Sequence, residues 1–242
     1  GFLGSEFSPF FLVEPDQAVD AVKPPDGMSD TRFAKRYKEY KKLLANSPIQ
    51  QHGSEHQKES LLKSIDNAHR LLSSPKARKA FDLSLESKES YDTYKVGGRF
   101  GLGCLLAKRL TEAGARFIEV THGYYPFKYW DTHDNGHTKM KDLKKMIDAP
   151  IAQLVLDLEK SKLLDRTLIV VASEFSRDMM MEGKPEKRVK DQVQVPARID
   201  GPQHYGMHRH FTGAGSVLLF GGGIKKGFVY GETADERPCT TI

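Results

Sequence analysis

Cysteine is scarce in this sequence of 242 residues, which contains only two of them. Two cysteines cannot form the several disulfides that hold a small secreted scaffold together, so disulfide-rich proteins are excluded. Cys104 lies in an apolar helical stretch and is predicted to be a buried thiol, whereas Cys239 carries no clear signal. The length is enough for one large domain or two small ones with a sizeable hydrophobic core.

Long apolar runs are also absent. The longest is Thr167–Ala172, which is the size of a strand and far below the roughly 20 residues that a membrane-spanning helix needs. We therefore predict no membrane span. Residues 1–28 lack the charged stretch followed by an apolar stretch that marks a signal peptide. Their four prolines predict an extended connecting segment, similar to the interior of a longer protein.

The sequence also lacks a segment in which charges of one sign are clustered. The chain has 37 basic and 32 acidic residues, a formal net charge of +5, and the two signs alternate along it. The most basic segment, Lys184–Lys190, is interrupted by Glu186 and has no aromatic residues beside it. Nucleic-acid binding favours clustered cations with aromatic residues between them, so we predict no nucleic-acid partner. The composition, 38% hydrophobic and 29% charged, is that of a globular protein.

The first part of the chain after the connecting segment carries helical patterns and no strand pattern. Apolar residues recur at spacings of three and four within 29–45 and 55–72, and Ser74-Pro75 is a typical helix start. We divide the chain into an extended connecting segment, a helical insert and an α/β core portion, at residues 1–28, 29–96 and 97–242.

From residue 97 onward, helical and strand patterns alternate. Helices are predicted at 101–113 and 138–164, the second with a kink or a restart at Pro150. Short β-branched or continuously apolar runs predict strands at 116–121, 167–172 and 216–220. The predicted fold class is therefore α/β, with a mostly parallel central sheet flanked by helices and a helical insert near the N-terminus.

Polar residues of metal-binding types lie next to the predicted strands. They form the clusters Tyr129–His137, Ser173–Asp178 and His204–His210, and six of the nine histidines lie between His122 and His210. Ligands in open α/β sheets bind at the carboxyl ends of the strands, and imidazole with carboxylate is a ligand set for zinc and related divalent metals. These three clusters therefore predict a metal site.

The leading candidate metal ligands are Asp131, His133 and Glu174. Asp131 and His133 share one turn, and Glu174 follows a strand end that we expect to be buried, where a carboxylate is costly without a cation. Arg177 offers a planar fork to phosphate or sulfate oxygens. Simpler roles stay open: Asp131 as the cap of an Asx turn, Glu174 as the ion-pair partner of Arg177, and any histidine as a solvated side chain.

The glycine-rich segments lack the spacing of known phosphate loops. Gly97–Gly103 opens a helix but follows no predicted strand, so we interpret it as the start of a packed helix rather than an anion site. Gly221–Gly223 follows a strand and predicts a hairpin-like return through Phe228–Tyr230. No serine lies in the G-x-S-x-G context of a hydrolase nucleophile.

A longer pattern extends from Ala77 to Arg237. Its segments are AFDLSLE, FGLGCLLAKRLTEAGARFIEV, YWDTHDN, APIAQLVLDLEKSKLLDRTLIVVASEFSRD and HFTGAGSVLLFGGGIKKGFVYGETADE. In this order the segments resemble the sulfatase-like domain-of-unknown-function family 1501, of the alkaline phosphatase and sulfatase superfamily. The opening GFLGSEFSPF resembles the family as well. The resemblance implies an alkaline phosphatase-like fold with two divalent metals at the carboxyl ends of the strands.

Two of the family's motifs are present with one change. Asp131 and His133 match the W-D-T-H element, which the resemblance assigns to metal binding. Glu174 and Arg177 match the E-F-G-R element, in which Ser176 replaces the glycine. The resemblance implies that Glu174 binds metal and that Arg177 binds the anionic group of the substrate.

A third motif departs from the family pattern. His210 matches the histidine of a late Asp-His pair, but Arg209 stands in place of the aspartate and is expected to weaken one half of the metal site. The metal ligands implied by the resemblance are Asp131, His133, Glu174 and His210, with His137, His204 and His208 as further candidates.

The first functional hypothesis is a metal-dependent, sulfatase-like hydrolase of phosphate or sulfate esters, with zinc, calcium or manganese as the metal. The resemblance implies that the nucleophile and the first strand precede residue 1 and that the chain is part of a longer protein. It also implies an anionic ester substrate, sulfated glycans included, and a periplasmic or other extracytoplasmic location. The alternative is a non-catalytic member that binds a sulfated or phosphorylated glycan or a protein partner, which Arg209 favours.

Overall fold

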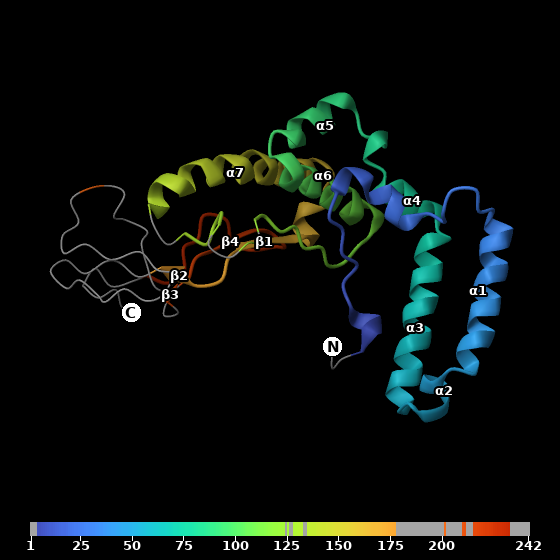
Figure 1. Ribbon diagram of the computed structural model, residues 1–242. Helices are drawn as coiled ribbons and strands as arrows, with labels where there is room; N and C mark the ends of the chain where they lie inside the picture. The colour runs from blue at the N-terminus through green and yellow to red at the C-terminus, as the bar shows by residue number, and fades with distance from the viewer. Residues whose placement is uncertain are drawn as a thin grey trace. The chain divides into compact units, whose positions relative to one another are not determined.

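Figure 1 shows the computed structural model, whose described residues are 4–123, 125, 128–132, 135–177, 201, 210–211 and 215–232. More than half of them lie in helices. The α-helices are α1 (Asp30–Ala45), α2 (Pro48–His52), α3 (Glu55–Leu72), α4 (Pro75–Phe81), α5 (Lys88–Lys95), α6 (Gly98–Ala113) and α7 (Gly136–Lys160). Short 3₁₀ helices cover Ser5–Phe7, Pro15–Val22, Leu83–Leu85 and Leu164–Arg166. The strands are β1 (Leu168–Ala172), β2 (Ser176–Arg177), β3 (His210–Phe211) and β4 (Val217–Gly221).

All strand pairs in the described residues are antiparallel, and each ladder has two strands. The prediction of an α/β fold with a mostly parallel central sheet flanked by helices is therefore wrong. The apolar runs at 167–172 and 216–220 do form β1 and β4, but an apolar run does not determine the direction of its neighbour. The registers are Leu168↔Gly221 to Ala172↔Val217 for β1 and β4, and Ser176↔Phe211 and Arg177↔His210 for β2 and β3.

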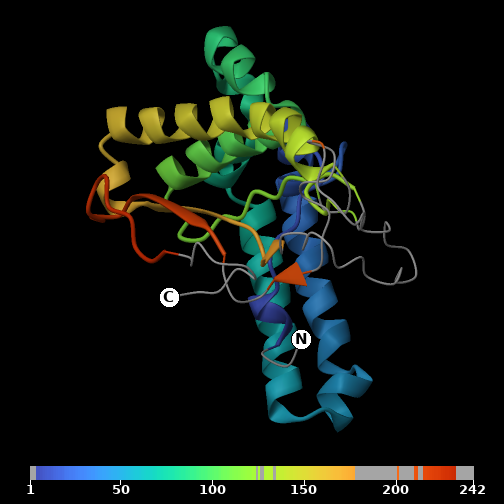
Figure 2. The same cartoon turned by 90° about the vertical axis from the view of Figure 1, so that its left-hand side faces the viewer.

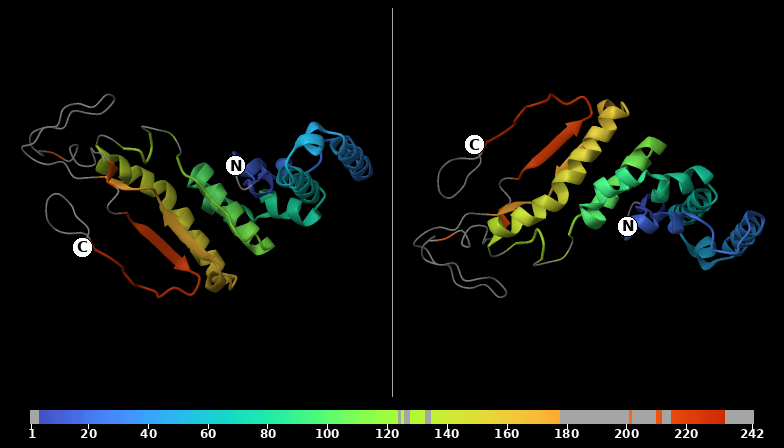
Figure 3. Two further views of the ribbon diagram at one scale, coloured as in Figure 1. Left: turned by 90° about the horizontal axis from the view of Figure 1, so that it is seen from below. Right: turned by 90° about the horizontal axis from the view of Figure 1, so that it is seen from above.

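The strands are also more exposed than their composition predicts. Leu168 and Val170 of β1 are 51% and 54% exposed, so one face of β1 is open, although a continuous apolar run is typical of a strand covered on both faces. Helix α7 lies alongside the β1–β4 ribbon (Figure 3). The strand predicted at 116–121 is absent from these described residues, and Phe117 is exposed.

The chain divides into two compact units. Unit 1 comprises Gly1–Tyr91 and Arg109–Ile118, and unit 2 comprises Asp92–Lys108 and Glu119–Ile242. Helix α6 therefore contributes residues to both units. None of the helices within the described ranges combines the length and the hydropathy of a membrane span.

In unit 1, α1 and α3 lie side by side and are joined through α2 (Figures 1 and 2). Each of α1 to α4 begins after a serine whose hydroxyl accepts a hydrogen bond from the backbone N–H three residues later. These serines are Ser29, Ser47, Ser54 and Ser74. The predicted helices at 29–45 and 55–72 and the predicted helix start at Ser74-Pro75 are confirmed.

Arg109 of α6 connects α4 to the segment that follows it. The side chains of Arg109 and Glu86 are only 12% and 11% exposed, and they form an ion pair with an Nη1–Oε1 distance of 2.5 Å. The guanidinium also donates to the backbone carbonyl of Ala80, 3.1 Å from Nε, and to that of Lys79. Carbonyls at the end of a helix lack partners within the helix, so Arg109 satisfies groups that α4 leaves open.

In unit 2, α6 and α7 lie close together because glycines meet a proline (Figure 3). A Cβ atom on Gly97 would lie 2.3 Å from Cγ of Pro150 and 2.7 Å from the carbonyl oxygen of Met146. A Cβ atom on Gly101 would lie 3.3 Å from the same Cγ. Both Gly101 and Pro150 are buried. The glycines therefore serve helix packing, in agreement with the interpretation of Gly97–Gly103 as the start of a packed helix.

Helix α7 runs from Gly136 to Lys160 without a break at Pro150, so the predicted restart of the helix there is wrong. Proline cannot donate to the carbonyl four residues earlier, which is that of Met146. The carbonyl of Met146 therefore lacks its usual hydrogen bond within the helix. Gly97, just before α6, lies close to this carbonyl and to the proline ring. Packing here outweighs the local cost of proline.

The core of unit 2 includes the fully buried side chains of Tyr94, Leu105 and Leu158. The Tyr94 hydroxyl donates to Oδ2 of Asp157 at 2.8 Å, which satisfies a polar group that burial would otherwise make costly. The prediction that Cys104 is a buried thiol is confirmed, since it is 2% exposed. Burial raises the pKa of this thiol to about 12, so it stays protonated and is a poor nucleophile at neutral pH.

Replacing Arg109 by methionine (Arg109→Met) is expected to destabilise unit 1 by about 3–5 kcal/mol, because the largely buried Glu86 carboxylate loses its cation. Urea unfolding followed by circular dichroism measures this change. The double variant Arg109→Met/Glu86→Leu removes both charges and is expected to be clearly more stable than the single variant. A double variant as unstable as the single one would contradict the ion-pair explanation.

Replacing Gly97 by alanine (Gly97→Ala) is expected to destabilise the protein by about 1–3 kcal/mol, because the added methyl group overlaps the Pro150 ring. Without that overlap, the same change would stabilise the protein by about 0.4–1 kcal/mol, because alanine leaves the unfolded chain fewer conformations than glycine does. The sign of the change in stability therefore tests the overlap. Thermal unfolding provides the measurement. Removing the ring in Gly97→Ala/Pro150→Ala should recover part of the loss, and a stabilised single variant would refute the close approach.

Candidate functional site

Two antiparallel ladders, β1 with β4 and β2 with β3, follow one another along the chain, and we call the two together the ribbon (Figure 1). Ser173–Phe175 separates β1 from β2. Gly215, which lies just before β4, is close to this connection, because a Cβ atom on it would lie 3.6 Å from the carbonyl oxygen of Glu174. The ribbon thus continues past the end of β1.

The far end of the ribbon brings three of the expected site residues together. Arg177 pairs directly with His210 across β2 and β3, and Glu174 lies two residues before β2. The structure places the backbones of Arg177 and His210, whereas their side chains lie outside the described part. Residues far apart in the sequence therefore share one end of the ribbon, and their roles in metal and anion binding stay predictions.

The burial argument for Glu174 is wrong. Its side chain is exposed, so no desolvation cost demands a cation beside it. The error follows from the exposure of β1 itself, since the sequence analysis assumed a strand that was covered on both faces. An exposed carboxylate at this position is still able to reach a ligand from the solvent side, but its position alone does not indicate a metal.

A tight turn at 128–132 positions Asp131. The backbone N–H of Asp131 donates to the carbonyl of Lys128 at 3.1 Å, and that of Thr132 donates to the carbonyl of Trp130 at 2.9 Å. Tyr129 adopts a positive φ of 53° in this turn. Lys128 and Tyr129 are exposed, whereas Asp131 is half-buried and Thr132 is buried, so the turn packs through its second half.

Most of the expected histidine ligands fall outside the described residues. Within the described ranges, no group of three or more histidine, cysteine, aspartate and glutamate residues is arranged to hold a metal ion. The backbone of His137 lies in the first turn of α7, but its side chain is not described. The histidines that lie wholly outside the described residues are His133, His204 and His208.

Asn135 is a candidate ligand that the sequence analysis missed. Its side-chain oxygen Oδ1 is buried and has no hydrogen-bond partner in the described part of the chain. A buried acceptor without a partner costs about 1–3 kcal/mol, and amide oxygens are ligands of hard divalent cations. Asn135 lies four residues after Asp131, so the two residues flank His133 in the sequence. The signal in the sequence is an amide residue within the Tyr129–His137 cluster, beside its imidazole and carboxylate groups.

Trp130, the residue before Asp131 in this turn, donates a hydrogen bond to a neutral histidine. Its Nε1 donates to Nδ1 of His122 at 2.7 Å, so Nδ1 carries no proton. The His122 ring also meets Phe100 of α6 edge-on, with ring centroids 5.4 Å apart. Burial lowers the pKa of His122 and favours this neutral form. The sequence analysis missed this pair, although the single tryptophan of the chain directly precedes Asp131.

A family model described as a protein of unknown function (DUF1501) matches residues 1–237. The chain belongs to the DUF1501 family. The match confirms the resemblance at the level of this family and includes the opening segment and the helical region around α1 to α3. No curated protein and no solved structure matches the chain.

In this DUF1501 protein, acidification is expected to break the Trp130–His122 hydrogen bond, because protonation of Nδ1 removes the acceptor. Since burial lowers the pKa of folded His122 below its ordinary 6.5, the stabilisation is fully present above pH 6.5 and is lost as the pH falls through the lower folded value. The fluorescence of the single tryptophan reports this transition.

The matched control is His122→Gln, in which an amide oxygen accepts from the indole but does not titrate. Its fluorescence is expected to be independent of pH over the range in which the parent changes. The same titration in both proteins would show that another group is responsible.

Proposed function

We propose that this DUF1501 chain supplies half of the divalent-metal site of a phosphate or sulfate ester hydrolase of the alkaline phosphatase and sulfatase superfamily. The observation that carries the proposal is the register of the ribbon, which pairs Arg177 with His210 and leaves Glu174 nearby. A carboxylate, an imidazole and a guanidinium at one place are the groups that bind a divalent metal and an anionic ester.

The donor set fits a divalent cation in its chemistry. Asp131, His133, Glu174 and His210 would hold the metal. The buried Oδ1 of Asn135, which lacks a hydrogen-bond partner among the described residues, would add a neutral oxygen ligand. Mixed nitrogen and oxygen donors suit zinc and manganese, and additional oxygens suit calcium. Further candidates for the same site are His137, His204 and His208.

Each remaining residue of the site has a role that does not depend on the identity of the metal. A divalent cation bound here would supply a Lewis acid beside the ester oxygens. Arg177 would hold the anionic group through two parallel hydrogen bonds, which fix its orientation. The Trp130–His122 hydrogen bond would keep the turn that carries Asp131 in one conformation. The proposal also includes two features that the resemblance implies: a catalytic nucleophile on a further strand, and an extracytoplasmic location.

A non-catalytic, anion-binding function is the second candidate, and Arg209 favours it. This arginine precedes His210, at the position where the resembled pattern has an aspartate. Arg209 lies outside the described residues, but its neighbour in the sequence, His210, pairs with Arg177, and guanidinium groups suit a sulfated or phosphorylated glycan without a metal.

The hydrolase proposal predicts about one equivalent of zinc, calcium or manganese in the purified protein, measured by mass spectrometry on the full-length gene product. Glu174→Gln and Asn135→Ala are expected to lower metal affinity at least tenfold, whereas the exposed Glu232→Gln should leave it unchanged. Hydrolysis of p-nitrophenyl phosphate or p-nitrophenyl sulfate should require the metal. Metal-free protein with the same activity, or no metal and no turnover, would refute the proposal.

The variant Arg209→Asp separates the two candidate functions. If the site binds metal, the new carboxylate restores a ligand and is expected to raise metal affinity. If the site binds a sulfated glycan directly, the same change removes a cation and is expected to weaken binding of a heparin fragment at least tenfold. Isothermal titration with the metal and with heparin measures both effects on the same protein.

A further inference from the structure

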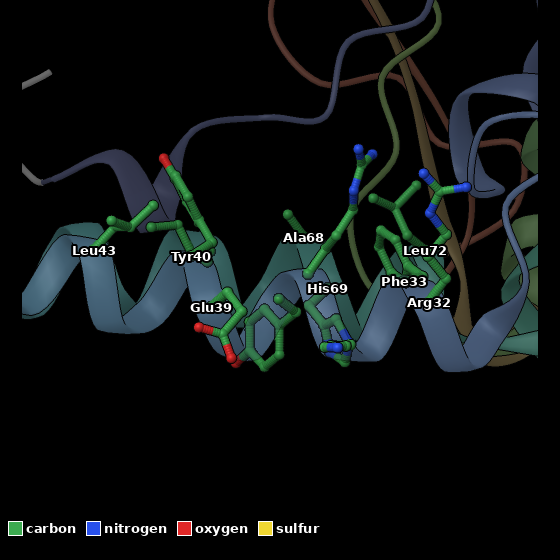
Figure 4. A pocket seen from close by; sticks show the side chains of 12 residues that line it. Arg32, Phe33, Glu39, Tyr40, Leu43, Ala68, His69 and Leu72 are labelled. Atoms are coloured by element: carbon green, nitrogen blue, oxygen red, sulfur yellow. The ribbon is translucent and has the colours of Figure 1, made fainter.

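An apolar groove of 750 Å³ runs between α1 and α3 in unit 1 (Figure 4). Its apolar lining comes from both helices and consists of Phe33, Tyr40, Leu43, Ile65, Ala68 and Leu72. Tyr40 is 50% exposed and Leu43 is 71% exposed, so this lining is open to solvent. A contiguous apolar surface of this kind marks a binding surface more often than isolated exposed apolar residues do.

The two helices that form the groove are held together without filling it. The His69 ring stacks on the Tyr37 ring at a centroid distance of 3.7 Å and lies 5.4 Å from that of Phe33. Asp66 of α3 accepts hydrogen bonds from the Tyr37 hydroxyl and from Nζ of Lys41, the latter at 3.1 Å. These cross-links fix the spacing of α1 and α3, so the groove is formed before any ligand binds.

Positive charge lies along the α1 side of the groove. Helix α1 carries six basic and two acidic residues. Three of the cations, Arg32, Lys35 and Arg36, line the groove and form no ion pair among the described residues. The acidic residue of the lining, Glu39, already pairs with Lys42 at 3.0 Å. The groove therefore has an excess of cations beside its apolar lining.

We propose that this groove binds an acidic amphipathic helix of a protein partner. Apolar side chains at a spacing of three and four would pack on the lining, and carboxylates beside them would pair with Arg32, Lys35 and Arg36. Leu43 lies ten residues after Phe33 on α1, a rise of about 15 Å, which matches a partner helix of about three turns. This binding surface lies in unit 1 and does not depend on the proposed hydrolase site.

The lining distinguishes this partner from other anions. Nucleic acids bind through stacking on aromatic rings and through phosphate contacts. Aromatic rings of Phe33, Tyr37, Tyr40 and His69 also line the groove, but Leu43, Ile65 and Leu72 add aliphatic surface on which bases do not stack. This aliphatic surface suits leucine-type side chains. A concave groove between two helices also suits a rod-shaped ligand better than a flat lipid surface.

The test uses a fluorescently labelled peptide of about four helical turns, with leucine at positions one, four, eight and eleven and glutamate beside them. The reference peptide has the same leucines with lysine in place of glutamate. Fluorescence anisotropy on the intact protein is expected to show at least tenfold tighter binding of the acidic peptide. Equal affinity for the two peptides would overturn the proposal.

Two charge reversals on α1 provide a matched pair of variants. Arg36→Glu changes a cation that lines the groove, whereas Lys38→Glu changes one that does not line it, and both change the net charge equally. Arg36→Glu is expected to weaken binding at least tenfold and Lys38→Glu less than twofold. Equal losses would indicate long-range attraction and would overturn the proposed groove.

A third variant tests the apolar contribution. Leu43→Glu places a charge on a side chain that is already exposed, so folding should be preserved, which circular dichroism verifies. It is expected to weaken binding of the acidic peptide at least tenfold. Unchanged binding of the peptide by this variant would overturn the proposal. The proposal would also be overturned if single-stranded DNA or phosphatidylglycerol vesicles bound more tightly than the peptide and Leu43→Glu weakened that binding.

Discussion

The antiparallel pairing of β1 with β4 and of β2 with β3 is the interaction on which the candidate site depends. A shift of register by one residue would turn every side chain of a strand to the opposite face, so this register determines that Arg177 pairs with His210. Ser173–Phe175 separates β1 from β2, and interruptions of a ladder are common near functional sites. Strand pairing, rather than a large buried sheet, therefore gathers the polar residues.

Several helices were predictable because their signals are local. Serine caps and apolar spacing lie within the same dozen residues as α1, α3 and α4, so the sequence indicated where these helices begin. The direction of β1 and β4 was not predictable, because it depends on contacts between distant segments. Apolar composition was interpreted as burial on both faces, and the exposure of Leu168 and Val170 shows that this inference from composition does not hold here.

The candidate site was predictable by residue type and not by environment. Histidines and carboxylates near strand ends were recognisable, whereas the exposure of Glu174 and the lack of a partner for Asn135 Oδ1 in the described part are properties of the folded chain. The same holds for the Trp130–His122 hydrogen bond. It joins two residues of one loop, and Phe100 of α6 packs against the His122 ring. Residue type suggests chemistry, and burial and hydrogen bonding decide which residues are available for it.

The ribbon also has a kinetic consequence. Helices depend on contacts between near neighbours and form within microseconds, whereas β1 meets β4 only after the long intervening segment closes into a loop. Each ladder in the described residues has two strands, and isolated two-stranded ribbons are only marginally stable. We therefore expect the helices to form before the candidate site does. A preparation can show its full helical circular dichroism signal while the residues around Arg177 and His210 are not yet assembled.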